Sequence, residues 1–303
     1  MARLVRKTWE SLNSMTDNSP KLRDYLILMR LDKPIGRWIL MWPMLWSMWI
    51  ASEGKVEITL LVIFLIGVVV MRSAGCVLND IADRDFDPFV KRTSNRPIAS
   101  GKIAVKNGIY LFMFLMGIAA SLLHALNDAT KILAIIGAII TIIYPFLKRI
   151  LSAPQLFLGV AFGWAIPMSF SANLGYVPIK GWLIFLIAIF WAVVYDTYYA
   201  MVDRDDDINL PVKSTAILFG KYDLFIVGIF QCMMVTALFI MASIANLGLW
   251  VYISIFLSMG LMIYHQYLTN KREREACFRA FMHNHYIGMI IFIGIILHYH
   301  FPI

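Results

Sequence analysis

Two clusters of acidic side chains stand where apolar stretches of this sequence end, and their residue types suit cation chemistry. Asn79, Asp83 and Asp87 follow the apolar run 58–77 at intervals of four residues. Because a helix completes a turn in 3.6 residues, this spacing predicts one polar stripe at the end of a hydrophobic helix. A second cluster, which includes Asp203 and Asp207, follows the apolar run 182–194. Carboxylate and amide oxygens are ligands of hard cations, so the two clusters predict a cation site.

Two further charged residues lie deeper inside these apolar runs. Arg72 stands seven residues before Asn79, about 10 Å deeper on the same predicted helix face. Asp196 shares a predicted face with Asp203 and Asp207. A charge within a membrane helix costs at least about 2.5 kcal/mol, so Arg72 and Asp196 must face a cavity or a partner. This pattern predicts a polar cavity below the acidic clusters.

The chemistry that fits two facing acidic clusters is the handling of a diphosphate. Mg²⁺ is typically held by one or two carboxylates together with substrate phosphate oxygens. Metal ions bound in this way neutralise the charge that builds on a departing diphosphate. Basic residues that follow the predicted helices would complete an anion site: Lys91, Arg92, Lys148 and Arg149.

Simpler interpretations exist for each of these residues. Acidic residues at the end of a membrane helix are often only solvated, and Arg72 could pair with Asp196 for structural reasons alone. Tyrosines beside Asp196 either line a cavity or pack in the core. The segment DRDDD resembles the start of a calcium-binding loop, but Ile208 and Ser214 replace its invariant Gly and Glu. Two clusters at matching depth favour a functional site over separate solvated ends.

The composition defines the class of protein around these residues. The chain has 303 residues, of which 60% are hydrophobic and 15% charged, against about 45–50% and about 25% in soluble domains. This indicates an all-α, polytopic membrane protein. Residues 1–24 form a predicted polar arm without a signal peptide, and residues 25–303 a single transmembrane domain. Nine spanning helices are predicted, near 34–51, 58–79, 107–125, 132–147, 154–173, 181–202, 222–245, 248–268 and 284–301.

The placement of basic residues predicts the orientation of these helices. If the N-terminus is cytoplasmic, 23 of the 27 Lys and Arg residues fall on the cytoplasmic side. The opposite side carries only Lys55, Lys131 and Lys180, and Arg72 lies within a span. This asymmetry follows the positive-inside rule and accounts for the net charge of +8 without a nucleic-acid partner. Both acidic clusters then face the cytoplasm.

Four segments of the sequence carry a family resemblance. NDIADRDFD with KRTSNRPIASG, and YDTYYAMVDRDDD with KSTAILFGKYD, resemble the two signatures of the UbiA family of membrane prenyltransferases. RLDKPIGRWILMWP and YPFLKR resemble the branch that acts on 4-hydroxybenzoate. These matches extend from about residue 25 to 225. The resemblance implies a bundle of nine helices around a central cavity that opens to lipid on one side.

The resemblance also implies an activity. It is the Mg²⁺-dependent transfer of a long-chain polyprenyl group from polyprenyl diphosphate to the 3-position of 4-hydroxybenzoate, in ubiquinone biosynthesis. The implied location is a bacterial inner membrane, with the active site facing the cytoplasm. Related enzymes use dihydroxynaphthoate, homogentisate or haem as acceptor, and a cation-coupled transporter is the alternative from another class. Prenyl chain length and oligomeric state stay open.

Carried over by resemblance, the acidic residues bind two Mg²⁺ ions. Asn79, Asp83 and Asp87 would hold one ion, and Asp203 and Asp207 the other. Asp83 and Asp203 are the ligands expected to be essential for catalysis.

The deeper residues would act on the organic parts of the substrates. Arg72 would pair with the carboxylate of 4-hydroxybenzoate. Asp196 would serve as the base or orient the substrate phenol, while Tyr195 and Tyr199 would stabilise an allylic cation through their aromatic faces. The diphosphate would be bound by Asn79, Lys91, Lys148 and Arg149.

Overall fold

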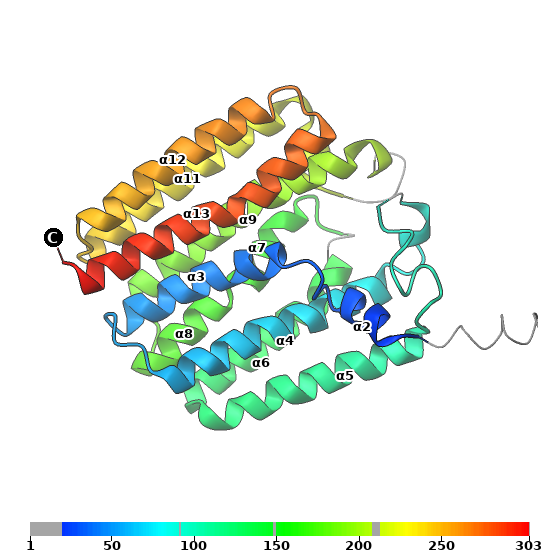
Figure 1. Ribbon diagram of the computed structural model, residues 1–303, viewed down its shortest axis with the longest axis horizontal. Helices are drawn as coiled ribbons and strands as arrows, with labels where there is room; N and C mark the ends of the chain where they lie inside the picture. The colour runs from blue at the N-terminus through cyan, green and yellow to red at the C-terminus, as the bar shows by residue number, and fades with distance from the viewer. Residues whose placement is uncertain (1–19, 91, 148–149, 208–212, 303) are drawn as a thin grey trace, which may run out of the picture.

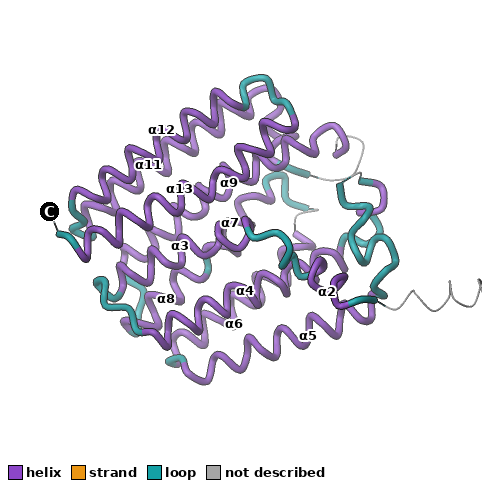
Figure 2. The backbone as a smooth tube through the Cα atoms, in the orientation of Figure 1, coloured by secondary structure: helices purple, strands orange, loops and turns teal. Residues whose placement is uncertain are grey.

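Helices make up all the regular structure in the part of the chain that the computed structural model describes, residues 20–90, 92–147, 150–207 and 213–302 (Figure 2). The prediction of an all-α fold is confirmed. The first half contains α2 (Leu22–Leu28), α3 (Ile35–Ala51), α4 (Ile58–Ala82), η1 (Asp87–Phe89), α5 (Val105–Leu122), η2 (Leu123–Ala125) and α6 (Asp128–Leu147). The second half contains α7 (Pro154–Gly163), α8 (Ala165–Leu174), α9 (Ile179–Asp207), α10 (Thr215–Phe219), η3 (Gly220–Tyr222), α11 (Asp223–Ile244), α12 (Leu249–Leu268) and α13 (Arg274–His300).

Eight helical segments within these described residues are long and apolar enough to cross a membrane. Nine were predicted, and the difference is α3, which has 17 residues and is shorter than the others. The last span was predicted to begin at 284, but α13 begins at Arg274. Its first turns alternate charged residues with buried Ala276, Cys277 and Ala280, so a search for a continuous apolar run does not include them.

The long helices lie nearly side by side in one bundle (Figure 1). Helix α13 packs against α3, α9 and α12, and α9 packs against α7 and α11. On the other flank α4 packs against α5, while α6 packs against α7, α8 and α4. Helix α2 and the loop after α4 lie at one end of the bundle, and the C-terminus lies at the other (Figure 1). The central helices therefore bring the ends of α4 and α9 to one side.

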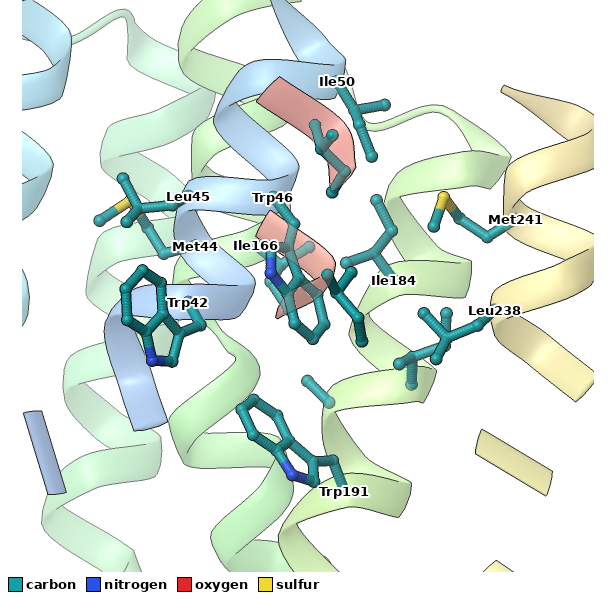
Figure 3. Packing of buried hydrophobic residues seen from close by; sticks show 14 of the residues in the cluster. Trp42, Met44, Leu45, Trp46, Ile50, Ile166, Ile184, Trp191, Leu238 and Met241 are labelled. Carbon is teal, nitrogen blue, oxygen red and sulfur yellow. The ribbon is translucent and has the colours of Figure 1, made fainter. Parts of the chain in front are cut away.

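The core is centred on stacked tryptophans from α3 and α9. Trp46 and Trp191 both point into this core (Figure 3), and their ring centres lie 5.5 Å apart with 18° between the ring planes. The indole N–H of Trp46 donates to the carbonyl of Gly288, at 2.9 Å. A Cβ at Gly288 would lie 2.5 Å from Trp42 and 2.6 Å from Trp191. Glycine therefore permits α13 to approach α3 and α9 closely.

The apolar segment predicted at 154–173 is broken into α7 and α8 at Trp164. Pro167 explains the break, because its ring clashes with the carbonyl of Gly163 four residues before and it has no N–H to donate. The kink leaves Trp164 facing α6, where its indole donates to the carbonyl of Leu133, at 2.7 Å.

The end of α4 differs from the prediction. The helix ends at Ala82, Asp83 is its C-terminal cap with φ −91° and ψ 3°, and Asp87 begins the short helix η1. The prediction that Asn79, Asp83 and Asp87 form one helical stripe is wrong at Asp87. Pro88 supplies the reason, since in a helix continued through this point its ring would clash with the carbonyl of Arg84 and it has no N–H to donate.

Candidate active site

A cavity of about 790 Å³ opens between the ends of α4 and α9. Its walls come from α2, α3, α4, α6, α7, α9 and α13 and from the loops that follow α2 and α4. Six of the residues singled out from the sequence line it: Arg72, Asn79, Arg92, Tyr195, Asp196 and Tyr199. The structure thus brings the deep charged residues of both acidic segments into one space.

Arg72 is held in the deep, apolar part of this cavity. Its guanidinium carbon lies 5.8 Å from the ring centre of Phe162, and its Nε is buried without a hydrogen-bond partner. The guanidinium also packs on Gly36, where a Cβ would collide with it. A buried cation with an unsatisfied donor is costly, so Arg72 is arranged to receive an anionic group.

The first acidic segment lies at the cavity mouth. Asn79 donates a hydrogen bond from Nδ2 to Asp83 Oδ2, at 3.0 Å. Asp87 is only 6% exposed and is bonded by Arg96, with 2.9 Å between Nη1 and Oδ2. Burial raises the pKa of Asp87 above its usual value, and Arg96 partly offsets this rise. Asn79, Asp83 and Asp87 therefore lie close together at the mouth, because the chain turns after Asp83 and not because they share one continuous helix.

The second acidic segment meets the loop that follows α4. Arg92 donates to Asp203 through Nε, at 2.9 Å to both carboxylate oxygens, and through Nη2, at 2.6 Å to Oδ2. The same guanidinium lies 4.8 Å from the ring centre of Tyr199. Asp207 is the last residue of α9, and its side chain lies outside the described part. Three predicted diphosphate ligands also lie outside the described residues: Lys91, Lys148 and Arg149.

Aromatic side chains line the wall between the deep and outer parts. Tyr195 lies 6.3 Å and Tyr199 4.6 Å from Phe281 of α13, measured between ring centres. Tyr198, which the sequence placed in the same cluster, faces the other way. It is fully buried and accepts a hydrogen bond from Gln231 of α11, at 3.4 Å. The helical turn explains this, because Tyr198 and Tyr199 are consecutive and their side chains point about 100° apart around the helix axis.

An ion-pair network at the mouth was not predicted. Arg30 binds Asp80 through two hydrogen bonds of 2.7 and 2.8 Å, and Arg96 joins Asp80, at 3.1 Å, to Asp87. Arg30 adopts a left-handed backbone conformation, φ 56°, where α2 ends. Asp80 follows Asn79 directly and lies outside the four-residue spacing on which the prediction of the site was based. The network fixes the loop that carries Asp87.

Basic residues gather in the outer part of the cavity. Arg30, Lys33, Arg92 and Arg96 line it beside the acidic residues Asp32 and Asp80. Burial lowers the pKa of Lys33 below its usual value, and the neighbouring Arg30 adds to this. A site in which cations repel one another is suited to bind a strongly charged anion.

The oxygen donors suit a hard cation that substrate helps to hold. Among the described residues, no three His, Cys, Asp or Glu side chains converge as a complete metal site. The mouth instead offers the amide and carboxylate of Asn79 and Asp83 on one side and the carboxylate of Asp203 on the other. Such donor sets fit Mg²⁺, which takes one or two carboxylates and completes its shell with phosphate oxygens and water.

Comparison with known proteins identifies the family. Residues 40–290 match the model of the UbiA prenyltransferase family. The chain belongs to this family. A relative from Coxiella burnetii (strain Dugway 5J108-111), named 4-hydroxybenzoate octaprenyltransferase, is 47% identical over 91% of this chain and 96% of its own. A relative of the same name from Escherichia fergusonii is 48% identical over 94% of this chain and 98% of its own. With its apolar helices, this UbiA-family chain is a multi-pass membrane protein.

Solved structures share the UbiA fold. The apo structure of a UbiA homolog from Aeropyrum pernix K1 superimposes with a TM-score of 0.76, at 23% identity, over 87% of this chain and 98% of that chain. A UbiA homolog from Archaeoglobus fulgidus, bound to GPP and Mg²⁺, gives a TM-score of 0.70 at 17% identity, over 90% and 99% of the chains. The predicted family fold is confirmed.

Proposed function

We propose that this UbiA-family chain transfers a long-chain polyprenyl group from polyprenyl diphosphate to the 3-position of 4-hydroxybenzoate, in ubiquinone biosynthesis. The observation that carries the proposal is Arg72, which lines the cavity together with Asn79 and has a buried Nε without a hydrogen-bond partner. Asp83 is bonded to Asn79, and Asp203 is bonded to Arg92 of the same cavity. An aromatic acid requires a cation deep in an apolar site, and a diphosphate requires cations at its entrance. The curated relatives named 4-hydroxybenzoate octaprenyltransferase support the same acceptor.

The proposed metal ligands are the oxygen donors at the mouth. Asn79, Asp83 and Asp87 hold one Mg²⁺, and Asp203 and Asp207 hold a second. When bound, Mg²⁺ neutralises the charge of the diphosphate as it leaves. Arg92 and Arg96, which line the cavity next to these donors, contribute positive charge on the same side. Lys91, Lys148 and Arg149 are proposed to extend this basic surface.

The acceptor is proposed to lie between Arg72 and Asp196. Its carboxylate accepts hydrogen bonds from Arg72, which satisfies the buried Nε. Its ring lies along Tyr195 and Tyr199, and the carbon next to the hydroxyl faces the outer part of the cavity. Arg72 pairing with Asp196 alone, the structural alternative, would leave the acid without a counter-ion.

The reaction breaks the bond between the allylic carbon and oxygen of the prenyl diphosphate, and the electron pair leaves with the diphosphate. Tyr195, Tyr199 and Phe281 present aromatic faces to the allylic cation and exclude water from it. The ring carbon next to the hydroxyl forms the new carbon–carbon bond. Asp196 then accepts the proton displaced from the ring or the phenol.

The proposed orientation places this chemistry at the cytoplasmic face of a bacterial inner membrane, with a cytoplasmic N-terminus. The basic residues of α2, of the loop after α4 and of the loop before α13 lie at the end of the bundle that holds the site. This is the arrangement that the positive-inside rule requires. Residues 25–303 are proposed to form one domain, and residues 1–24 a cytoplasmic arm.

The proposal is tested by transfer in membranes or detergent. The assay combines 4-hydroxybenzoate, a long-chain polyprenyl diphosphate and Mg²⁺, and a parallel sample contains EDTA. The expected product is 3-polyprenyl-4-hydroxybenzoate, and none should form with EDTA. Transfer to dihydroxynaphthoate or homogentisate, but not to 4-hydroxybenzoate, would show that the proposed acceptor is wrong and that the reaction class is right. Folded protein that transfers to no acceptor but moves cations would overturn the proposal.

A further inference from the structure

An apolar groove of about 770 Å³ runs between α9 and α11. One wall is formed by Leu183, Leu186 and Phe190 of α9, and the other by residues of α11 between Leu224 and Ile240. On α11 this lining extends over about 24 Å, at 1.5 Å per residue, which is most of a hydrocarbon core of about 30 Å. Among the described residues, the groove and the catalytic cavity have no lining residue in common. The groove is therefore a separate space.

The groove faces the hydrocarbon of the bilayer. Phe225 and Ile229 line it and are 70% and 42% exposed, as expected of side chains in contact with lipid. None of the described residues that line it is charged. The side-chain nitrogen of Gln266 donates to the carbonyl of Leu224, at 3.2 Å, and to Gln231, at 2.9 Å. An occupant therefore gains mainly apolar contacts, which selects a hydrocarbon chain.

One end of the groove lies beside a cluster of basic side chains. Leu224, which lines this end, follows Asp223 in the chain. The buried carboxylate of Asp223 binds both Arg204 and Arg272. Arg272 also donates from Nη2 to the carbonyl of Lys221, at 3.0 Å. The cluster thus contains three basic residues and one carboxylate, and its excess positive charge reaches the surface at the exposed Lys221.

Two of these basic residues can receive a phosphate. Within the described part of the chain, Arg272 directs Nε and Nη2 to the buried carboxylate and to the carbonyl of Lys221, which leaves Nη1 for an anion. Lys271 and Glu273, on either side of Arg272, offset each other in charge. The Lys221 ammonium lies 5.1 Å from the ring centre of Tyr222. Tyr222 is exposed, and tyrosines are enriched where a bilayer meets water, so this end of the groove lies at headgroup level.

We propose that the groove binds one acyl chain of an anionic phospholipid, and that the phosphate of this lipid lies against Lys221 and Arg272. Basic pockets between membrane helices attract the headgroups of anionic lipids, and each Lys or Arg near the surface strengthens this binding about fivefold. A second copy of the chain is disfavoured as the occupant. Two copies in one membrane that paired through this face would place the same basic ends next to each other, where like charges repel.

The first test measures lipid binding to the delipidated full chain by native mass spectrometry. The wild type should bind phosphatidylglycerol about 25-fold more tightly than phosphatidylcholine with the same acyl chains, since two basic residues contribute about fivefold each. Lys221→Gln should reduce this preference to about fivefold. Lys106→Gln is the matched control, because Lys106 is also exposed and lies 5.6 Å from a tyrosine ring, that of Tyr110 on α5. Equal binding of the two lipids by the wild type, or an unchanged preference in Lys221→Gln, would overturn the inference.

A second pair of variants tests the groove itself. A Cβ at Gly228 would meet only Gln266, at 3.6 Å, so the ring of Gly228→Phe would project into the groove. Gly228→Phe should weaken the binding of both lipids about tenfold or more, which corresponds to the contacts of about two methylene groups. Gly260→Phe adds the same ring to the exposed surface of α12, where nothing lies within 4 Å of the new Cβ, and should bind lipid as the wild type does.

Two results with Gly228→Phe would contradict the inference. One is wild-type affinity for phosphatidylglycerol. The other is a wild-type dimer that Gly228→Phe converts to a monomer in the same spectra, which would assign the groove to a second copy.

Photolabelling locates the lipid on the wild-type protein. Phosphatidylglycerol with a diazirine midway along one acyl chain is photolysed on the protein, and the labelled peptides are identified. The label should fall on residues 183–190 of α9 and 224–240 of α11. Unlabelled phosphatidylglycerol should suppress it, and inorganic phosphate should not. Label confined to other helices, or suppression by inorganic phosphate, would overturn the inference. These measurements contain no prenyl substrate, so their outcome does not depend on the proposed function.

Discussion

Arg92 and Asp203 form a bidentate ion pair across the mouth of the catalytic cavity. The distances are 2.6 Å between Nη2 and Oδ2 and 2.9 Å between Nε and Oδ1. The pair links the loop after α4 to the end of α9. It joins a proposed metal ligand to a cation that lines the cavity. Mg²⁺ at Asp203 must therefore compete with Arg92, and a displaced guanidinium would lie beside the diphosphate.

This competition predicts the effect of Arg92→Gln on metal binding. Removal of the competing charge should tighten binding of Mn²⁺, a reporter for Mg²⁺, by about fivefold, because a partly exposed pair contributes about 1 kcal/mol. Electron paramagnetic resonance of free Mn²⁺, without substrates, measures the affinity. Arg84→Gln is the matched control, since Arg84 pairs with the exposed Asp85, at 3.3 Å. Weaker Mn²⁺ binding by Arg92→Gln would mean that Arg92 orients Asp203 for the metal.

Loss of a proposed metal ligand should stop catalysis without unfolding the protein. Asp83→Asn and Asp203→Asn should each lower the transfer rate by at least about 100-fold, since a carboxylate ligand of the cation is lost. Asp85→Asn, in the same loop but 67% exposed at its side chain, should keep the wild-type rate. Transfer rates are compared in protein that elutes as a single species in detergent. Near-normal rates for both metal-ligand variants would contradict the two-ion proposal.

Arg72→Ala should affect the acceptor much more than the prenyl donor. The KM for 4-hydroxybenzoate should rise about 10- to 100-fold, because a hydrogen bond to a charged group contributes about 1.5–3 kcal/mol. The KM for the prenyl diphosphate should change little. Gly36→Ala is a second variant, because its methyl group would displace the guanidinium of Arg72 without removing the charge. It should also raise the KM for 4-hydroxybenzoate and not that for the prenyl diphosphate, but by a smaller factor than Arg72→Ala. Equal effects on both substrates would make Arg72 a structural residue.

Asp196→Asn should slow transfer while metal binding is retained. An amide in place of the proposed base removes a general-base contribution of about 100- to 10,000-fold. Mn²⁺ affinity should equal that of the wild type, because Asp196 lies in the wall of the cavity beside Tyr195 and Tyr199 and is not one of the proposed ligands. The two measurements together distinguish a base from a ligand. An unchanged rate, or a loss of Mn²⁺ binding, would contradict the assigned role.

The sequence predicted the helical class and the convergence of Arg72, Asn79 and Asp196, because hydrophobic runs and helical spacing are local properties. It could not predict the path of the chain after Asp83. That path depends on Pro88 and on an ion-pair network whose members are far apart in the sequence, such as Arg30 and Asp80. The apolar cavity lined by α4, α5 and α6 was also not predicted, because a cavity depends on how helices are spaced and not on any one helix.

The carboxylate of Asp223 joins three parts of the fold at the same end of the bundle. It is fully buried and binds Arg204 of α9 and Arg272 of the loop before α13, the latter at 2.8 Å between Nη2 and Oδ1. Arg204 follows Asp203 directly and also donates to the carbonyl of Ala216, at 2.8 Å. The carboxylate thus fixes the end of α9 that carries a proposed metal ligand.

Asp223→Asn should therefore destabilise the protein. Two guanidinium groups lose their counter-charge, but both are partly exposed, so the expected cost is about 2 kcal/mol and the midpoint of thermal unfolding in detergent should fall by roughly 5 °C. Asp205→Asn is the control, because Asp205 pairs with Arg274 at side-chain exposures of 75% and 44% and should show no resolvable shift. If both variants unfolded at the wild-type midpoint, the buried carboxylate would not be what holds the end of α9.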